Sequence, residues 1–148
     1  MKKLFGTAAL AFMLCLTGLV ISGTALGGGG GQCEDNGDET VTDNGTGLIW
    51  QKATAGPMNW HQAMSYASSL TLGGNSNWRP PNKDELIGLF NSPCKDMMNV
   101  IMCGYWSSTT DAYEASLLAW RIHYSDGRAR NINKSGNNFY VRAVRSAQ

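Results

Sequence analysis

The chain has 148 residues, of which 43% are hydrophobic and 16% are charged, and this composition excludes an intrinsically disordered protein. Lys and Arg number 12 against 11 Asp and Glu, so the formal net charge of +1 gives no electrostatic argument for nucleic-acid binding. The length favours one domain, and 18 Gly and 5 Trp indicate a loop-rich fold with large apolar anchors.

The N-terminal segment has the plan of a secretory signal peptide. Lys2 and Lys3 precede an apolar run over residues 4–21, and small residues follow as far as Ala25. An uncleaved membrane anchor is the alternative, because the run approaches the length that spans a bilayer. Cleavage after Ala25 would divide the chain into a signal peptide over residues 1–25, a Gly-rich spacer over 26–32 and a domain over 33–148.

Three cysteines follow the expected cleavage point, and export would place them in an oxidising compartment. Cys94 and Cys103 flank one short segment, and we expect them to form a disulfide. Two buried free thiols are the alternative. Cys33 is then left over, either free or bonded to another chain.

The first predicted element is a hairpin over residues 39–53. Strand-forming residues lie on both sides of Asn44-Gly45, a dipeptide typical of tight turns. The acidic residues in and before this hairpin lack the ligand spacing of a calcium loop, which favours a solvated acidic hairpin over a calcium site. These acidic residues are Glu34, Asp35, Asp38, Glu39 and Asp43.

Two helices are predicted next. Residues 59–74 carry an apolar stripe at three- and four-residue steps, with Asn59 as N-cap and Gly73 or Gly74 at the end. Pro80-Pro81 precede a second, shorter helix, in which Asn82 and Glu85 have the spacing of a capping box.

Strands follow from Tyr105 to the C-terminus. Residues 119–133 form a predicted hairpin around Asp126-Gly127, and residues 137–145 form a final strand. The order is therefore a hairpin, two helices and then a run of strands. It predicts an α+β fold with grouped helices rather than an alternating parallel sheet.

The C-terminal hairpin carries the candidate binding residues. A two-residue turn at Asp126-Gly127 would pair His123 with Arg130 and place the basic residues on one face, with Trp120, Ile122 and Tyr124 on the buried face. A three-residue turn would separate the basic residues. Guanidinium groups suit sulfate, carboxylate and phosphate oxygens.

We expect residues 109–115 to form a loop that borders this face. The predicted ligand-binding residues are Asp111, Tyr113, Glu114, Arg121, His123, Arg128 and Arg130. A solvated hairpin whose charges only confer solubility is the alternative.

The serines after Trp106 raise the question of catalysis. A serine nucleophile needs a base in hydrogen-bond reach, and His61 and His123 are the two histidines of the chain. No Gly-x-Ser-x-Gly elbow is present. We therefore expect Ser107 or Ser108 to be buried and bonded to backbone, and we expect no catalytic residue, metal or cofactor.

Five segments in order resemble the Lcl C-terminal domain family, also called DUF1566. They are "VTDNGTGLIWQK", "GGNSNWRPPNKDEL", "YWSSTT", "AWRIHYSDG" and "YVRAVR". The resemblance implies a bacterial, exported protein with a C-type-lectin-like fold. It also implies that the domain binds a ligand, and two kinds of ligand-binding protein are known with this fold. The corresponding domain of a collagen-like adhesin binds sulfated glycosaminoglycans, and similar tails occur in the variable proteins of diversity-generating retroelements.

The chain also departs from this family. Arg79-Pro80-Pro81 stands where members usually have Arg-Leu-Pro, and Ala67 stands where many have Cys, which leaves Cys33 without an obvious partner in the chain. A collagen-like repeat and the calcium motifs of sugar-binding animal lectins are absent from the sequence, so metal-dependent sugar binding is not implied.

These observations predict an exported, non-enzymatic recognition domain that is periplasmic, at the cell surface or secreted. It would bind an anionic glycan or a protein ligand through its C-terminal strands and loops, without nucleic acid. It would contact a membrane only if the N-terminal segment stays uncleaved. The alternatives are a diversified ligand-binding protein of a retroelement and a structural domain of the envelope, with an enzyme the least favoured.

Overall fold

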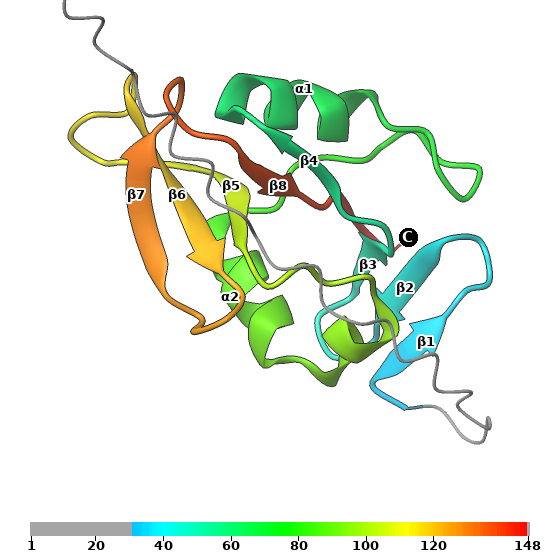
Figure 1. The fold of residues 1–148 in the computed structure, drawn as a ribbon. Coiled ribbons are helices and arrows are strands. Elements are labelled where there is room, and N and C mark those ends of the chain that lie inside the picture. The colour runs from blue at the N-terminus through cyan, green and yellow to red at the C-terminus, as the bar shows by residue number, and fades with distance from the viewer. Residues whose placement is uncertain (1–30, 148) are drawn as a thin grey trace, which may run out of the picture.

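The computed structural model describes residues 31–147, which form two sheets and two α-helices (Figure 1). The predicted signal peptide and most of the spacer lie outside these residues. One sheet has the order β1-β2-β3-β9 and the other β4-β8-β5-β6-β7. The α+β class is confirmed. The strands are β1 (Cys33–Asp35), β2 (Thr40–Asp43), β3 (Leu48–Gln51), β4 (Ala55–Met58), β5 (Gly104–Thr110), β6 (Leu118–His123), β7 (Ala129–Asn133), β8 (Phe139–Val141) and β9 (Val144–Ser146).

The predicted N-terminal hairpin is β2 and β3, which pair antiparallel with Thr42 opposite Ile49. The positive φ that the turn needs falls on Gly47, at 69°, and not on Gly45 as the Asn-Gly dipeptide had suggested. The buried Asp43 carboxylate holds the turn, because its Oδ1 accepts the Gly45 N–H at 2.9 Å. Among residues 31–147, no group of three or more His, Cys, Asp or Glu side chains is placed to hold a metal ion.

The helices α1 (Trp60–Ser69) and α2 (Lys83–Asn91) both begin with a complete capping box. The N-cap Asn59 and the box of Asn82 and Glu85 were predicted, whereas the part that Gln62 plays in α1 was not. The first helix ends earlier than expected, because the Leu70 backbone is already extended with a ψ of 135°. Gly73 and Gly74 instead supply positive φ values to the turn that follows. A 3-10 helix, η1 (Pro93–Met97), comes directly after α2.

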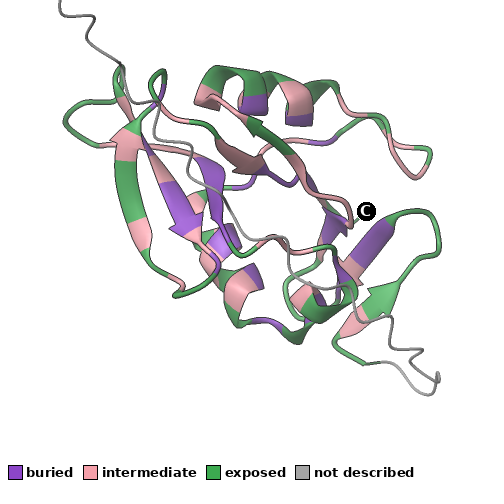
Figure 2. Cartoon of the chain, in the orientation of Figure 1, coloured by how far each residue is buried: buried purple, intermediate pink, exposed green. Residues whose placement is uncertain are grey.

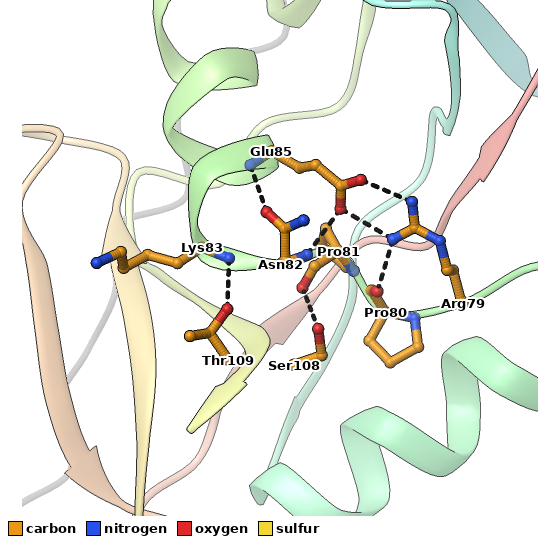
Figure 3. Close-up of polar contacts among 8 residues, drawn as sticks. All are labelled: Arg79, Pro80, Pro81, Asn82, Lys83, Glu85, Ser108 and Thr109. Atoms are coloured by element: carbon orange, nitrogen blue, oxygen red, sulfur yellow. Dashed lines mark hydrogen bonds and ion pairs between the residues drawn. The ribbon is translucent and has the colours of Figure 1, made fainter. Parts of the chain in front are cut away.

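The N-terminus of α2 is tied to strand β5 and to the segment before the helix (Figure 3). The Lys83 N–H donates to Thr109 Oγ1 at 2.9 Å, and the Ser108 hydroxyl donates to the Pro81 carbonyl at 3.1 Å. Arg79 donates two hydrogen bonds to the Glu85 carboxylate, at 2.6 and 2.9 Å. Ser108 and Thr109 therefore belong to a strand that positions a helix, and the predicted loop begins only after Thr110.

The predicted C-terminal strand is two strands in different sheets. The chain leaves the second sheet after Val141 and enters the first at Val144, with Arg142 at the crossing. Arg142 is 1% exposed, and its guanidinium donates to four oxygens. These acceptors are the carbonyls of Gln51, Lys52 and Asn99 and the hydroxyl of Thr54. Arg142 thereby holds the two sheets and the segment before β5 together.

The disulfide prediction was wrong. Cys94 is bonded to Cys33, with their Cα atoms 5.2 Å apart, and not to Cys103. The reason is that η1 turns back beside the first sheet, where the Ser92 hydroxyl donates to the Asp43 carboxylate at 3.1 Å. Cys103 lies instead beside the end of β6, where its carbonyl accepts the Tyr124 N–H at 2.9 Å. The short separation of Cys94 and Cys103 in sequence was therefore misleading.

The second sheet forms the middle layer of the core, and its central strands are mostly buried (Figure 2). One face packs Tyr105 and Ile122 against Leu86 and Leu89 of α2. The other face packs Trp106 and Val141 in a cluster with Ala63 and Ala67 of α1. In the part of the chain that the structure describes, no helix is long and apolar enough to cross a membrane.

The Arg142 crossing predicts a large loss of stability when the side chain is removed. Arg142→Met should lower the free energy of unfolding by about 3 kcal/mol or more, because it leaves buried carbonyls without donors. Chemical denaturation measures this loss. Arg128→Met is the matched control, since Arg128 is exposed and its replacement should change stability by at most about 0.5 kcal/mol. Equal stabilities of the two variants would contradict the role of Arg142.

The disulfide predicts a specific linked fragment. Cys33 and Cys94 should appear in one cross-linked peptide when the protein is digested without reductant. The bond closes a loop with a sequence separation of 61 residues. Cys33→Ser should therefore cost up to about 4 kcal/mol of stability by the chain-entropy estimate. A fragment that links Cys94 to Cys103 would disprove the pairing.

Candidate anion-binding site

The hairpin of β6 and β7 places its basic residues on one face, although its turn is not the predicted one. Arg121 pairs with Arg130, and the His123 N–H donates to the Arg128 carbonyl at 3.0 Å. Four residues, 124–127, connect the strands instead of two. The pairing therefore shifts by two positions, and an even shift keeps every side chain on its face because side chains alternate along a strand.

A hollow of about 200 Å³ opens on this basic face. It is lined by side chains from β6, from the turn and from β7. The lining residues are Arg121, His123, Ser125, Asp126 and Arg130. Three of the predicted ligand-binding residues, Arg121, His123 and Arg130, therefore lie together.

Arg121 has an unusual environment for a charged residue. It is 9% exposed, and its guanidinium carbon lies 4.8 Å from the centre of the Phe139 ring. Gly104 provides the space: a Cβ atom there would lie 2.8 Å from Phe139 Cδ1 and 3.0 Å from Arg121 Cδ. The Phe139 ring and the absence of a side chain at Gly104 together hold Arg121 against the sheet.

The Arg121 guanidinium makes no hydrogen bond with any residue in the range 31–147. Its Nε and Nη1 atoms are sealed from solvent without a partner, which leaves Nη2 as the nitrogen that can reach a ligand. Burial lowers the pKa of Arg121, and the nearby charge of Arg130 lowers it further. A buried charge without a partner is costly, and an anion in the hollow would reduce that cost.

His123 is held in one tautomer by its neighbour. The Ser125 N–H donates to His123 Nδ1 at 3.3 Å, and the Ser125 hydroxyl lies 2.8 Å from the same nitrogen. Because Nδ1 accepts this hydrogen bond, the neutral ring carries its proton on Nε2. Burial lowers the pKa of His123, and the positive charge of Arg121 lowers it further. The ring can therefore offer a neutral Nε2–H to a ligand.

Arg128 lies on the same face but outside the lining of the hollow. Its side chain is 70% exposed, and its Nε is 3.7 Å from the Asp126 carboxylate. The Asp126 carboxylate also accepts the Arg128 N–H at 3.0 Å. Arg128 is therefore paired at the rim, while Arg121 and Arg130 have no ion pair among the described residues.

Asp111, Tyr113 and Glu114 are not among the residues that line the hollow, and their role in ligand binding stays a prediction. Their loop precedes Leu118, at one end of β6, whereas the hollow lies towards the His123 end (Figure 1). The two ends of the strand are about 17 Å apart at the usual rise per residue. Asp111 accepts the N–H groups of Tyr113 and Glu114 at 2.9 and 3.0 Å, and the Tyr113 side chain is 97% exposed. The loop is joined to the hairpin, because the Asn131 side chain of β7 donates to the Asp111 carboxylate at 2.5 Å.

The sequence reasoning missed Gly104 and Phe139, which position Arg121. An isolated glycine in a strand pattern is a signal of close approach by another group, and Gly104 begins β5. Phe139 carried no comparable signal, because it reaches Arg121 only through the pairing of β8 with β5. That pairing is parallel, with Tyr105 opposite Tyr140.

The serines of the "YWSSTT" segment have backbone partners. Ser107 is fully buried, and its hydroxyl donates to the Trp120 carbonyl at 2.9 Å. Ser108 donates to Pro81, as described above. The expectation that one of the two serines is buried and bonded to backbone is confirmed.

The family model of the Lcl C-terminal domain matches residues 39–145. The chain belongs to this family. No curated protein matches the chain. The Lcl C-terminal domain match contains the basic hairpin, Gly104, Phe139 and Cys94, whereas Cys33 precedes it. The disulfide therefore joins the family domain to a strand that lies before the matched residues.

The environment of His123 predicts its titration. The ring should titrate below 6.5, the ordinary value, because burial and the Arg121 charge both disfavour the protonated form. Arg121→Met should raise the pKa of His123. Titration of the ring carbon resonances by NMR measures both. Since the folded-state pKa is lowered, His123 favours folding above pH 6.5, and this contribution should decline as the pH falls through the folded pKa. An unchanged His123 titration in Arg121→Met would contradict the electrostatic coupling.

Proposed function

We propose that this protein is an exported, non-enzymatic recognition domain that binds an anionic group, on a glycan or on a protein, in the hollow of the basic hairpin. The observation that carries the proposal is the Arg121 guanidinium. It is buried, has no hydrogen-bond partner among the described residues and borders a hollow that Arg130 and His123 also line. An oxyanion would supply the acceptor that the chain itself does not.

The size of the hollow supports a single anionic group as the unit that is recognised. About 200 Å³ suits one sulfate or carboxylate rather than several. A longer polyanion would gain further contacts along the exposed side chains of Arg128 and Arg130. Such contacts are individually weak, so its affinity should fall as salt screens the exposed charges.

We also propose that the domain has a C-type-lectin-like architecture and is exported. The pairing of β3 with β9 supports the architecture, because it joins the two ends of the domain in one sheet. The Cys33–Cys94 disulfide supports export, since such bonds persist in oxidising compartments. The backbone partners of Ser107 and Ser108 support a non-enzymatic role for that segment.

The loop at the other end of β6 supports a second candidate, a protein ligand. Tyr113 and Leu117 are 97% and 54% exposed, and exposed aromatic residues are frequent anchors at protein interfaces. The Lys134 ammonium holds this loop by donating to the Ala115 carbonyl at 2.6 Å. A diversified ligand-binding protein of a retroelement would use such a surface. A structural domain of the envelope would need neither surface.

Binding to immobilised heparin across a salt series tests the anion site. Arg130→Ala should weaken binding about two- to five-fold, the usual effect of losing one exposed ion contact. Arg121→Met should weaken it further, because Arg121 reaches the base of the hollow. Arg145→Ala is the matched control: it removes one positive charge from β9, in the other sheet, and should have little effect.

Circular dichroism and thermal melting of each variant provide the folding control. Equal retention of folded wild type, Arg121→Met and Arg130→Ala would refute the anion site. A similar loss in Arg145→Ala would show that only overall charge matters. Loss of protein-ligand binding in Tyr113→Ala, with heparin binding unchanged, would favour the loop as the recognition surface.

A further inference from the structure

A second hollow lies between the β2–β3 hairpin and helix α2. It is a cleft of about 360 Å³. The lining residues are Asp43, Thr46, Leu48, Trp50, Asn82, Asp84, Glu85, Gly88 and Leu89. None of these residues lines the basic hollow, and the lining contains no lysine or arginine.

Trp50 contributes an unpartnered hydrogen-bond donor to this acidic cleft. The indole N–H groups of Trp60, Trp78 and Trp106 each donate to a backbone carbonyl. Trp50 is 1% exposed, and its Nε1–H has no acceptor among residues 31–147. Some polar atoms of the described residues are sealed from solvent and have no hydrogen-bond partner, but Trp50 Nε1 is not one of them. The small accessible part of Trp50 therefore includes its N–H, and the residue lines the acidic cleft.

Gly88 keeps the wall of the acidic cleft open. It lies inside α2, where glycine is less favourable than alanine. A Cβ atom at Gly88 would meet nothing within 4 Å, so packing within the chain does not require a glycine there. The φ angle of Gly88 is not positive, so the backbone conformation does not require a glycine there either. Because Gly88 has no side chain, the space beside Leu89 on the wall of the acidic cleft stays open.

The charges around the acidic cleft favour a cation. Both oxygens of Glu85 are engaged by Arg79 (Figure 3). Burial raises the pKa of Glu85, but the hydrogen bonds from Arg79 and from the Asn82 N–H outweigh it and the pKa is lowered. The Asp43 carboxylate accepts from Gly45 and Ser92. Asp84 has no hydrogen bond or ion pair with any residue that the structure describes. Its carboxylate is therefore available to a ligand.

We propose that the acidic cleft binds a lysine or arginine side chain of a partner protein. A peptide that carries such a residue supplies the three features that the cleft requires. Its cationic head would pair with Asp84, its apolar stem would pack on Leu48 and Leu89, and a peptide carbonyl would accept the Trp50 N–H. An anionic glycan is disfavoured by the carboxylates, and a neutral sugar leaves Asp84 without a counter-charge. This site is independent of the basic hollow and of its ligand.

An NMR titration tests the acidic cleft. The probe is a blocked Gly-Lys-Gly peptide, compared with the same peptide carrying uncharged norleucine in place of lysine. The indole Nε1–H signal of Trp50 is assigned by its loss in Trp50→Phe. It should move on titration with the lysine peptide. Affinity for the lysine peptide should exceed that for the norleucine peptide about two- to five-fold, as expected for one exposed ion contact.

Three variants separate the contributions. Asp84→Asn should abolish the preference for lysine over norleucine, whereas Asp96→Asn, which removes an exposed carboxylate elsewhere, should retain it. Gly88→Met should fill the cleft and weaken binding about ten-fold or more, which corresponds to about 1.4 kcal/mol. Gly88→Ala is the smaller control. Gly88 lies on an exposed part of the helix, so both substitutions should leave the fold intact, and thermal melting checks this.

Several outcomes would overturn the proposal. One is a Trp50 signal that does not respond to the lysine peptide, and another is an equal response to the norleucine peptide. A response to methyl glucoside but not to lysine would assign the acidic cleft to a neutral sugar instead. Unchanged binding in folded Gly88→Met would place the peptide elsewhere on the surface.

Discussion

The architecture depends on one buried cation at the point where the chain crosses from one sheet to the other. Arg142 follows β8 and precedes β9 by two residues, so its position determines how the second sheet meets the first. Burial of a guanidinium is costly unless its donors are satisfied. Here four oxygens from two separate segments, residues 51–54 and Asn99, accept from it. The cost of burial is thereby offset by contacts that only the assembled fold provides.

Arg121 shows the opposite solution to the same physical problem. It is 9% exposed against 1% for Arg142, but an aromatic ring replaces the carbonyl acceptors, and no described residue bonds its guanidinium. A cation over a ring recovers only part of the lost hydration. The same type of side chain therefore stabilises the fold at one position and remains available to a ligand at the other. The difference lies in the acceptors around each guanidinium.

Helix α2 separates two hollows of opposite charge. One side of the helix packs on the sheet that carries the basic hairpin, and the other side faces the acidic cleft. Asp84 and Gly88 are on that second side, while Leu86 packs against the sheet. The capping box and the Arg79 ion pair hold the N-terminus of the helix in place. The proposed anion site and the proposed cation site would therefore lie on different sides of the helix.

The sequence by itself determined the local elements, because caps, turns and side-chain alternation act between residues close in the chain. Asn59, Asn82 and the alternation along β6 are examples, and the family was recognisable from ordered segments. Tertiary structure alone decided the pairing of Cys33 with Cys94, the split of the final strand at Arg142 and the distance of Tyr113 from the basic hollow. These features depend on which distant segments meet in space, and local patterns carry no record of such contacts.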